Sequence, residues 1–115
     1  MTARREYLDY AQDIYDSIVD IETFITGMDF EQFDGDKKTV NAVIRSLEII
    51  GEAAKKIPKE ITDNYPGVPW REMCTMRDKL IHGYFGVDKA ILWNVSTEEI
   101  PPLKSIFRRI LEAGQ

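Results

Sequence analysis

Apolar residues recur every three or four positions along most of the chain, which is the spacing of amphipathic α-helices. The first such run extends over residues 6–25, and Gly27 follows it as a C-terminal stop. The stretch 28–36 is typical of a loop, with room for one helical turn around Phe30 and Phe33. The pattern therefore predicts a long N-terminal helix followed by a connection.

A second helix is predicted over residues 37–57, and it is apolar around most of its circumference. Its polar residues follow one narrow line along the helix: Asn41, Arg45, Glu48 and Glu52. A helix of this kind is buried on more than one side. The polar line is either the solvent-facing edge of a core helix or a strip directed into a cleft or a subunit interface. Both interpretations stay open at this point.

Turn-forming residues interrupt the chain after the second helix. Pro58 closes that helix, and residues 59–64 can form one more turn before the extended linker 65–69. A third helix is predicted from residue 70 to about residue 82, where Gly83 breaks it.

The C-terminal part of the chain predicts two more helices. Asp88 can cap the fourth helix with its side chain. Ser96 or Thr97 then restarts the chain as a last helix, with Pro101 inside its first turn and Pro102 at its edge. No strand-like alternation or internal repeat accompanies these patterns. The economical fold class is all-α, an up-down bundle of four main helices with room for a short fifth.

Length and composition are consistent with one small globular domain. A chain of 115 residues fits a single domain, 1–115, with one modest core. Hydrophobic residues make up 43% and charged residues 30%, which is typical of soluble proteins. No apolar run approaches the roughly 20 residues of a spanning helix, and no secretory signal precedes the first helix. We therefore expect a cytoplasmic protein that does not contact a membrane.

The charge of the chain limits how it could bind nucleic acid. A net charge of −5 argues against non-specific binding of nucleic acid over a broad surface. Any RNA would have to bind at a small local site. Three basic clusters are available, although such clusters are usually solvated helix faces: Lys37 with Lys38, Lys55 and Lys56 with Lys59, and Arg108 with Arg109.

The chain has few residues that could hold a metal ion. One cysteine, Cys74, and one histidine cannot supply the three or four ligands of a zinc site within one chain. Metal-independent chemistry without a cofactor is therefore favoured.

One segment can carry such chemistry, because Arg77, His82 and Tyr84 lie within eight residues. A histidine can exchange a proton with a ribose hydroxyl near neutral pH, and an arginine can stabilise negative charge at phosphorus. Residues five apart on one helix are separated by about 140° in azimuth, so Arg77 and His82 would not face one substrate atom. Either the helix unwinds at Gly83, or two subunits of a homodimer contribute to one site. A purely structural role, with Arg77 in an ion pair and His82 at a helix end, also stays open.

The wider sequence resembles a known family. Residues 76–88, which hold the pattern Arg, four residues, His, any residue, Tyr, resemble the signature of HepT-like proteins of the HEPN superfamily. Residues 43–55 and 69–73 are similar to two further stretches of that family, so the resemblance covers about 36–103.

The resemblance implies a four-helix HEPN fold, usually a homodimer, and an RNase toxin of a type VII-like toxin–antitoxin pair. It implies that Arg77 and His82 are catalytic, and the chemistry of a histidine and an arginine at a ribose phosphate predicts a 2′,3′-cyclic phosphate as the product. It also implies that an MntA-like nucleotidyltransferase antitoxin transfers AMP to Tyr84. The RNA substrate could be tRNA or mRNA. The alternative is a non-enzymatic HEPN module that binds nucleotide or a nucleotidyltransferase, with Arg77 and Tyr84 as contacts.

Overall fold

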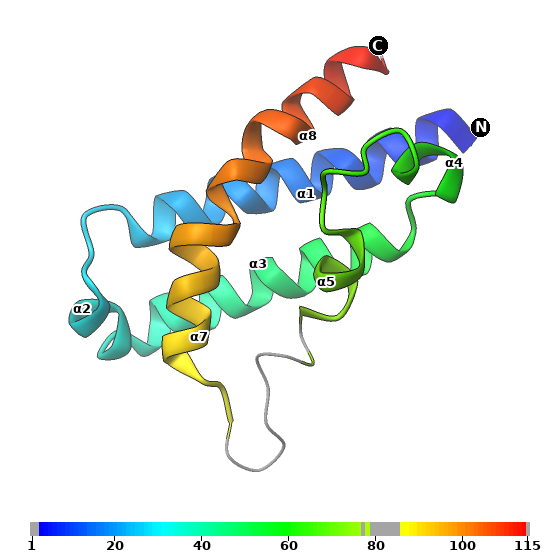
Figure 1. Ribbon diagram of the computed structural model, residues 1–115. Coiled ribbons are helices and arrows are strands. Elements are labelled where there is room, and N and C mark those ends of the chain that lie inside the picture. Colours follow the sequence, from blue (N-terminus) through cyan, green and yellow to red (C-terminus); the bar gives the residue numbers. More distant parts are fainter. Residues whose placement is uncertain (1–2, 77, 79–85, 115) are drawn as a thin grey trace.

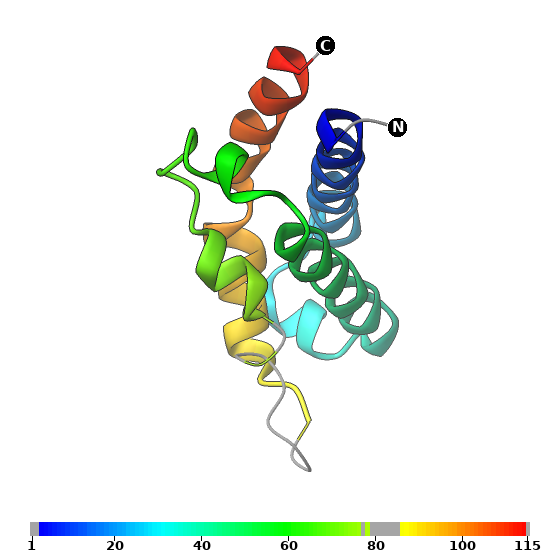
Figure 2. The same cartoon turned by 90° about the vertical axis from the view of Figure 1, so that its right-hand side faces the viewer.

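Three long helices form the body of the molecule (Figure 1). This computed structural model describes residues 3–76, 78 and 86–114. Helices α1 (Ala3–Ile25) and α3 (Lys37–Lys55) run antiparallel, and α8 (Pro101–Ala113) also packs against α1. The view in Figure 2 shows the same grouping from the side. Over the described ranges the elements are helices and no strand is formed, so the predicted all-α bundle is confirmed.

Short helices connect and support the three long ones. Helix α2 (Phe30–Asp34) links α1 to α3, which agrees with the single turn expected around Phe30 and Phe33. After α3, the chain forms α4 (Lys59–Thr62), α5 (Trp70–Cys74) and α7 (Lys89–Asn94). Helix α5 packs on α3, and α2 packs on both α3 and α7.

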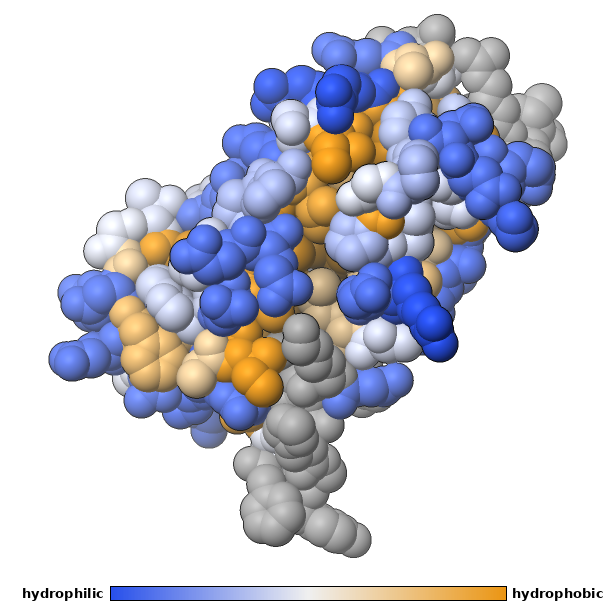
Figure 3. All heavy atoms as spheres, in the orientation of Figure 1, coloured by the Kyte–Doolittle hydropathy of each residue, from blue (hydrophilic) through white to orange (hydrophobic). Residues whose placement is uncertain are grey.

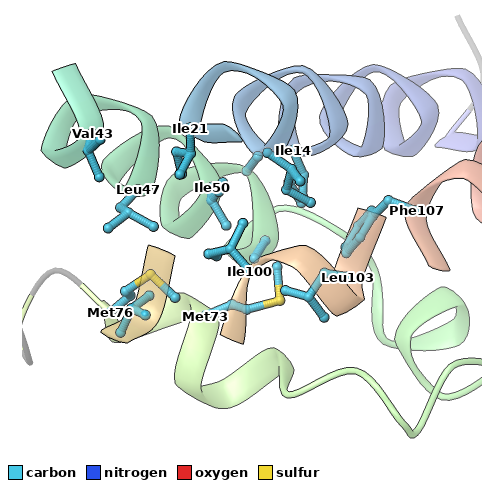
Figure 4. Packing of buried hydrophobic residues seen from close by; sticks show 14 of the residues in the cluster. Ile14, Ile21, Val43, Leu47, Ile50, Met73, Met76, Ile100, Leu103 and Phe107 are labelled. Atoms are coloured by element: carbon cyan, nitrogen blue, oxygen red, sulfur yellow. The ribbon is translucent and has the colours of Figure 1, made fainter. Parts of the chain in front are cut away.

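The core lies where α1, α3, α5 and α8 meet (Figure 4). Its largest fully buried side chains come from all parts of the chain: Ile14, Ile18, Ile21, Phe33, Leu47, Ile50, Met73, Leu92, Ile100, Phe107 and Ile110. Most of these residues occupy the apolar positions whose spacing predicted the helices, whereas Phe33 comes from the predicted loop. None of the described helices is both long and apolar enough to cross a membrane.

Helix ends follow the signals in the sequence. Gly27 has a φ of 77°, a left-handed conformation that glycine adopts at low cost, and the chain turns there after α1. The Asp29 carboxylate accepts the backbone N–H of Gln32, and the Gln32 side chain accepts the N–H of Asp29. This reciprocal cap starts α2. Asp88 caps α7 as predicted, since its side chain accepts the N–H of Ile91 at 3.1 Å.

The predicted restart at Ser96 or Thr97 is wrong. Their hydroxyls donate backwards to the carbonyls of Leu92 and Trp93, both at 2.8 Å, instead of capping a new helix. The chain continues from α7 through a π-helical turn, η2 (Val95–Glu99), directly into α8.

Two adjacent prolines give the physical reason for the π-helical turn. Pro101 and Pro102 have no N–H, so neither can extend the regular ladder of backbone hydrogen bonds. The N–H of Ile100 reaches five residues back to Val95 at 2.9 Å, which widens the turn just before them. The fourth and last predicted helices therefore form one continuous run.

The third predicted helix is interrupted. Helix α5 begins at Trp70 as expected, but it ends at Cys74, and Thr75 has a φ of −104° and a ψ of 8°. The Thr75 hydroxyl donates to the carbonyl of Arg71 at 3.1 Å, a local bond that competes with helix continuation. Met76 and Asp78 are helical again, and the rest of the predicted helix lies outside the described residues.

Asp36 should make stability depend on acid pH, because it caps α3. Its carboxylate accepts the Thr39 N–H at 3.0 Å and the Thr39 hydroxyl at 2.9 Å, and these bonds lower the pKa of Asp36 below 3.8. The cap therefore contributes its full stabilisation at any pH above the ordinary pKa of an aspartate. This stabilisation is lost as pH falls through the lowered pKa of Asp36. We expect Asp36→Ala to lower the unfolding temperature at pH 7, while Asp36→Asn, which keeps a cap, lowers it less. The gap between the wild type and Asp36→Asn should narrow as pH falls through the lowered pKa of Asp36, and thermal scans by circular dichroism would measure it.

Candidate functional site

Buried methionines anchor the chain immediately before the Arg77–Tyr84 segment. Met73, in the last turn of α5, is 1% exposed, and Met76 is 5% exposed. Figure 4 shows Met76 below Leu47 of α3, and Met73 next to Ile100 and Leu103. Trp70 adds a second attachment, since its indole N–H donates to the Tyr65 carbonyl at 3.0 Å. Apolar packing therefore holds the entry to the predicted catalytic segment.

Gly51 lets α5 approach α3 closely. A Cβ added at this position would lie 3.1 Å from the carbonyl oxygen of Met73 and 3.8 Å from that of Cys74. The first distance is shorter than an ordinary contact, so α5 would have to shift by a few tenths of an ångström. The backbone leading to Arg77 therefore depends on the missing side chain of Gly51.

Gly51→Val should move α5 away from α3 and reduce RNA cleavage. The extra carbon atoms overfill the contact, and overpacking of this kind costs about 1–3 kcal/mol. Gly51→Ala should be milder, since its better helix propensity, worth about 1 kcal/mol, offsets the tight contact. Urea unfolding and an RNA cleavage assay would test both variants.

Gly67→Ala is the matched control for these variants, because a Cβ at that loop position meets no atom within 4 Å. Wild-type stability and cleavage in Gly51→Val would mean that α5 does not need this close approach.

The chain is also fixed where it leaves the segment. Gly86 has a φ of 76°, and Val87, half-buried, packs against the core. Asp88 then caps α7, and Lys89 bridges to Asp34 at the end of α2, with 3.6 Å between its Nζ and a carboxylate oxygen. Arg77, His82 and Tyr84 themselves lie outside the described residues. The structure describes the chain on both sides of them, which we call the frame: Trp70–Met76 before the segment and Gly86–Lys89 after it.

The polar line on α3 lies at the surface of the single chain. Asn41, Arg45 and Glu52 are exposed, whereas Glu48 is half-buried. The line does not open into one hollow, because Asn41 lines a groove beside α2 and α7, and Glu52 lines a smaller hollow of about 90 Å³ beside α1. The solvent-facing interpretation is supported for one chain, and the interface interpretation stays a prediction.

Most of the predicted basic clusters have local partners. Lys59 pairs with Asp63 at 2.9 Å, Lys56 lies over the ring of Tyr10, and Arg108 donates to the hydroxyl of Tyr15 at 3.2 Å. These contacts fit the interpretation of solvated helix faces.

Other chemistry has little support in the described part of the chain. Burial raises the pKa of the Cys74 thiol, although Lys55 nearby opposes the shift. The thiol therefore stays protonated at neutral pH and is a poor nucleophile. Across residues 3–76, 78 and 86–114, no three or more His, Cys, Asp and Glu side chains gather as a metal site would require.

Comparison with known proteins places this frame in a family. The family model described as "Ribonuclease HepT-like" matches residues 14–110. The chain belongs to the HepT-like ribonuclease family. The match includes the buried core of α1 and α8 as well as the Arg77–Tyr84 segment, so membership does not rest on the short motif alone.

Relatives of the HepT-like family agree with this assignment. "Probable ribonuclease HepT" of Thermococcus cleftensis is 52% identical, over 93% of this chain and 97% of its own. A protein of Methanocaldococcus jannaschii named as a candidate RNase is 46% identical, over 95% and 94%. Another from that organism, named as a gamma-glutamylcyclotransferase and candidate RNase, is 40% identical over 95% of this chain and 49% of its own. The search of solved structures returned no significant match.

Sequence reasoning missed two features of this HepT-like chain. The close approach at Gly51 is one of them, since nothing local in the sequence indicates which backbone will approach this position. The groove beside Asn41 was also missed, because Lys89 and Val87 reach it from residues almost fifty positions away along the chain. The signal that could have indicated it was the pair Lys37 and Lys38, next to an apolar helix face.

Proposed function

We propose that this HepT-like protein is a metal-independent endoribonuclease, the toxin of a type VII-like toxin–antitoxin pair, and that its active form is a homodimer. The family match over residues 14–110 carries the proposal, together with the intact Arg77, His82 and Tyr84. The fixed chain on both sides of these residues supports it, since a catalytic segment needs a rigid base.

The proposed reaction needs an acid, a base and a positive charge at phosphorus. His82 accepts the proton of a ribose 2′-hydroxyl, and the 2′-oxygen attacks the adjacent phosphorus. Arg77 stabilises the extra negative charge that develops on the phosphoryl oxygens. The bond to the 5′-oxygen breaks, and that oxygen takes a proton from the His82 of the second copy. The products are a 2′,3′-cyclic phosphate and a 5′-hydroxyl.

End-group analysis of the cleaved RNA tests this reaction. RNA incubated with the purified protein in EDTA should yield ends that carry a cyclic phosphate, and the 5′ ends should be substrates for a polynucleotide kinase. Loss of cleavage in EDTA, or 5′-phosphate ends, would contradict the reaction. No cleavage at all, with retained binding to a nucleotidyltransferase, would favour the non-enzymatic alternative.

The protein should be a homodimer in solution. Each chain has one histidine, whereas the acid and base roles require two groups, and a two-fold dimer supplies the pair. Multi-angle light scattering at micromolar concentration should give twice the mass of 13.3 kDa. A strictly monomeric mass in a preparation that still cleaves RNA would remove the shared site.

A further inference from the structure

A groove of about 460 Å³ opens between the end of α2, the first turns of α3 and the start of α7. This volume is within the roughly 300–1,000 Å³ of small-ligand sites. The surface near it is partly apolar: Figure 3 shows apolar side chains among hydrophilic ones over α2 and the start of α7, and Phe30 of α2 is 37% exposed. The groove is therefore large enough for one nucleotide.

The lining combines an apolar floor with polar groups at the rim. Val40 and Ile44 of α3 and Val87 supply the floor, an apolar surface against which a flat base can lie. Asn41 adds an amide that can both donate to and accept from the edge of a base. This is the mixture of apolar walls and a few placed polar groups that small-ligand sites share.

Charge favours a phosphate at this groove. Its lining has two lysines and one aspartate, a positive balance in a chain whose net charge is −5. Lys89 is held at the rim by Asp34, since its Nζ also donates to the Asp34 backbone carbonyl at 3.2 Å. Lys37 has no ion-pair partner among the residues that the structure describes, so its ammonium group is available to an anion.

The groove is close to the catalytic segment along the chain. Val87, which lines the groove, follows Tyr84 by three residues, and three residues span at most about 11 Å. A strand of RNA whose reacting phosphate lies at that segment reaches the groove within a short stretch.

We propose that this groove binds one nucleotide of the RNA substrate beside the cleaved phosphate. The base lies on Val40 and Ile44, and Lys37 and Lys89 bind a flanking phosphate. The proposal rests on the ribonuclease function, and it adds a specificity-determining subsite made of residues outside the Arg77–Tyr84 segment.

Binding of an RNA that cannot be cleaved tests the subsite separately from the reaction. A fluorescent oligoribonucleotide with 2′-O-methyl groups lacks the attacking hydroxyl, and its affinity is measured by anisotropy at several salt concentrations. Lys37→Ala should weaken binding about fourfold at 0.15 M salt and reduce the salt slope by about 0.7, as loss of one single-strand phosphate contact predicts.

Lys38→Ala is the matched control, since Lys38 is the exposed neighbour of Lys37 on the same turn and does not line the groove. Its effect should be clearly smaller. Equal effects of the two variants would indicate non-specific electrostatics and would overturn the subsite. Methyl NMR gives a second measurement, in which the signals of Val40, Ile44 and Val87 should shift on addition of the RNA. Unshifted signals at saturation would also overturn it.

Other occupants give different results. If free AMP binds as tightly as the oligonucleotide, the groove is a mononucleotide site and not an RNA subsite. If Lys37→Ala changes the mass in light scattering, a second copy of the chain covers the groove, and the proposal is wrong. Cleavage of unmodified RNA by the wild type is followed in parallel. If the wild type cleaves RNA and Lys37→Ala cleaves it at the same rate, the subsite is wrong but the ribonuclease function stands. If the wild type never cleaves RNA, the ribonuclease function is wrong.

Discussion

His82→Ala should reduce the rate of RNA cleavage by at least about 10²–10⁴-fold, the range for one positioned general acid or base, because in the proposed homodimer it removes both the base and the acid. The chain contains no other histidine that could replace it. Arg77→Ala should lower the rate by about 10²–10³-fold, since it removes a charge directed at the developing phosphoryl charge. A gel assay with a labelled RNA measures both, and growth inhibition on expression should disappear with each variant.

Both variants should keep their fold, because both residues are assigned chemical roles. Arg71→Ala is the matched control, since Arg71 is an exposed arginine on α5 near the same segment. It should retain wild-type cleavage and helical circular dichroism. If His82→Ala or Arg77→Ala unfolds, that residue has a packing role instead. Full activity in either folded variant would remove it from the mechanism.

Addition of AMP to Tyr84 should abolish cleavage. With a partner nucleotidyltransferase and ATP, the protein should gain the mass of one or more AMP units, and its RNase activity should disappear. The added phosphate and nucleoside lie two residues from His82 along the chain, where they can exclude RNA and pair with Arg77. Intact-mass spectrometry with peptide mapping locates the modification.

Tyr84→Phe separates modification from catalysis. This variant lacks the phenolic oxygen, so it should cleave RNA at the wild-type rate and escape covalent silencing. Tyr10→Phe, on the regular helix α1, is the control and should be silenced like the wild type. AMP found only on another residue, or a fully modified Tyr84→Phe protein, would exclude Tyr84 as the switch.

Local signals in the sequence predicted the helices well and their connections less well. The start of α3 and the caps at Asp88 and Gly27 follow from side chains within a few residues of each end. The failure at Ser96 has a specific cause. A serine at this position could cap a new helix with its hydroxyl. Instead, the hydroxyl donates back to Leu92, because Pro101 and Pro102 lack N–H groups and the chain passes into α8 through a π-helical turn.

The candidate site could be predicted only where its residues are close in sequence. Arg77, His82 and Tyr84 form a short motif, whereas the chain that leads into it depends on Gly51 of α3 lying close to the Met73 carbonyl of α5. Such contacts between distant residues leave no periodic pattern. The ion pair of Lys89 with Asp34 joins the start of α7 to the end of α2, and it could not be predicted from the sequence either.

The first turn of α1 and the last turn of α8 lie at the same end of the molecule, away from residues 76 and 86 (Figure 1). Gly114 is buried, and a Cβ there would collide with the side chain of Leu8 on α1. This geometry suits circular permutation, because a short linker can join the old termini while new ones open in the exposed turn at Gly67. It equally suits fusion, since a domain attached at the first turn of α1 or the last turn of α8 starts far from the groove beside α2 and α7.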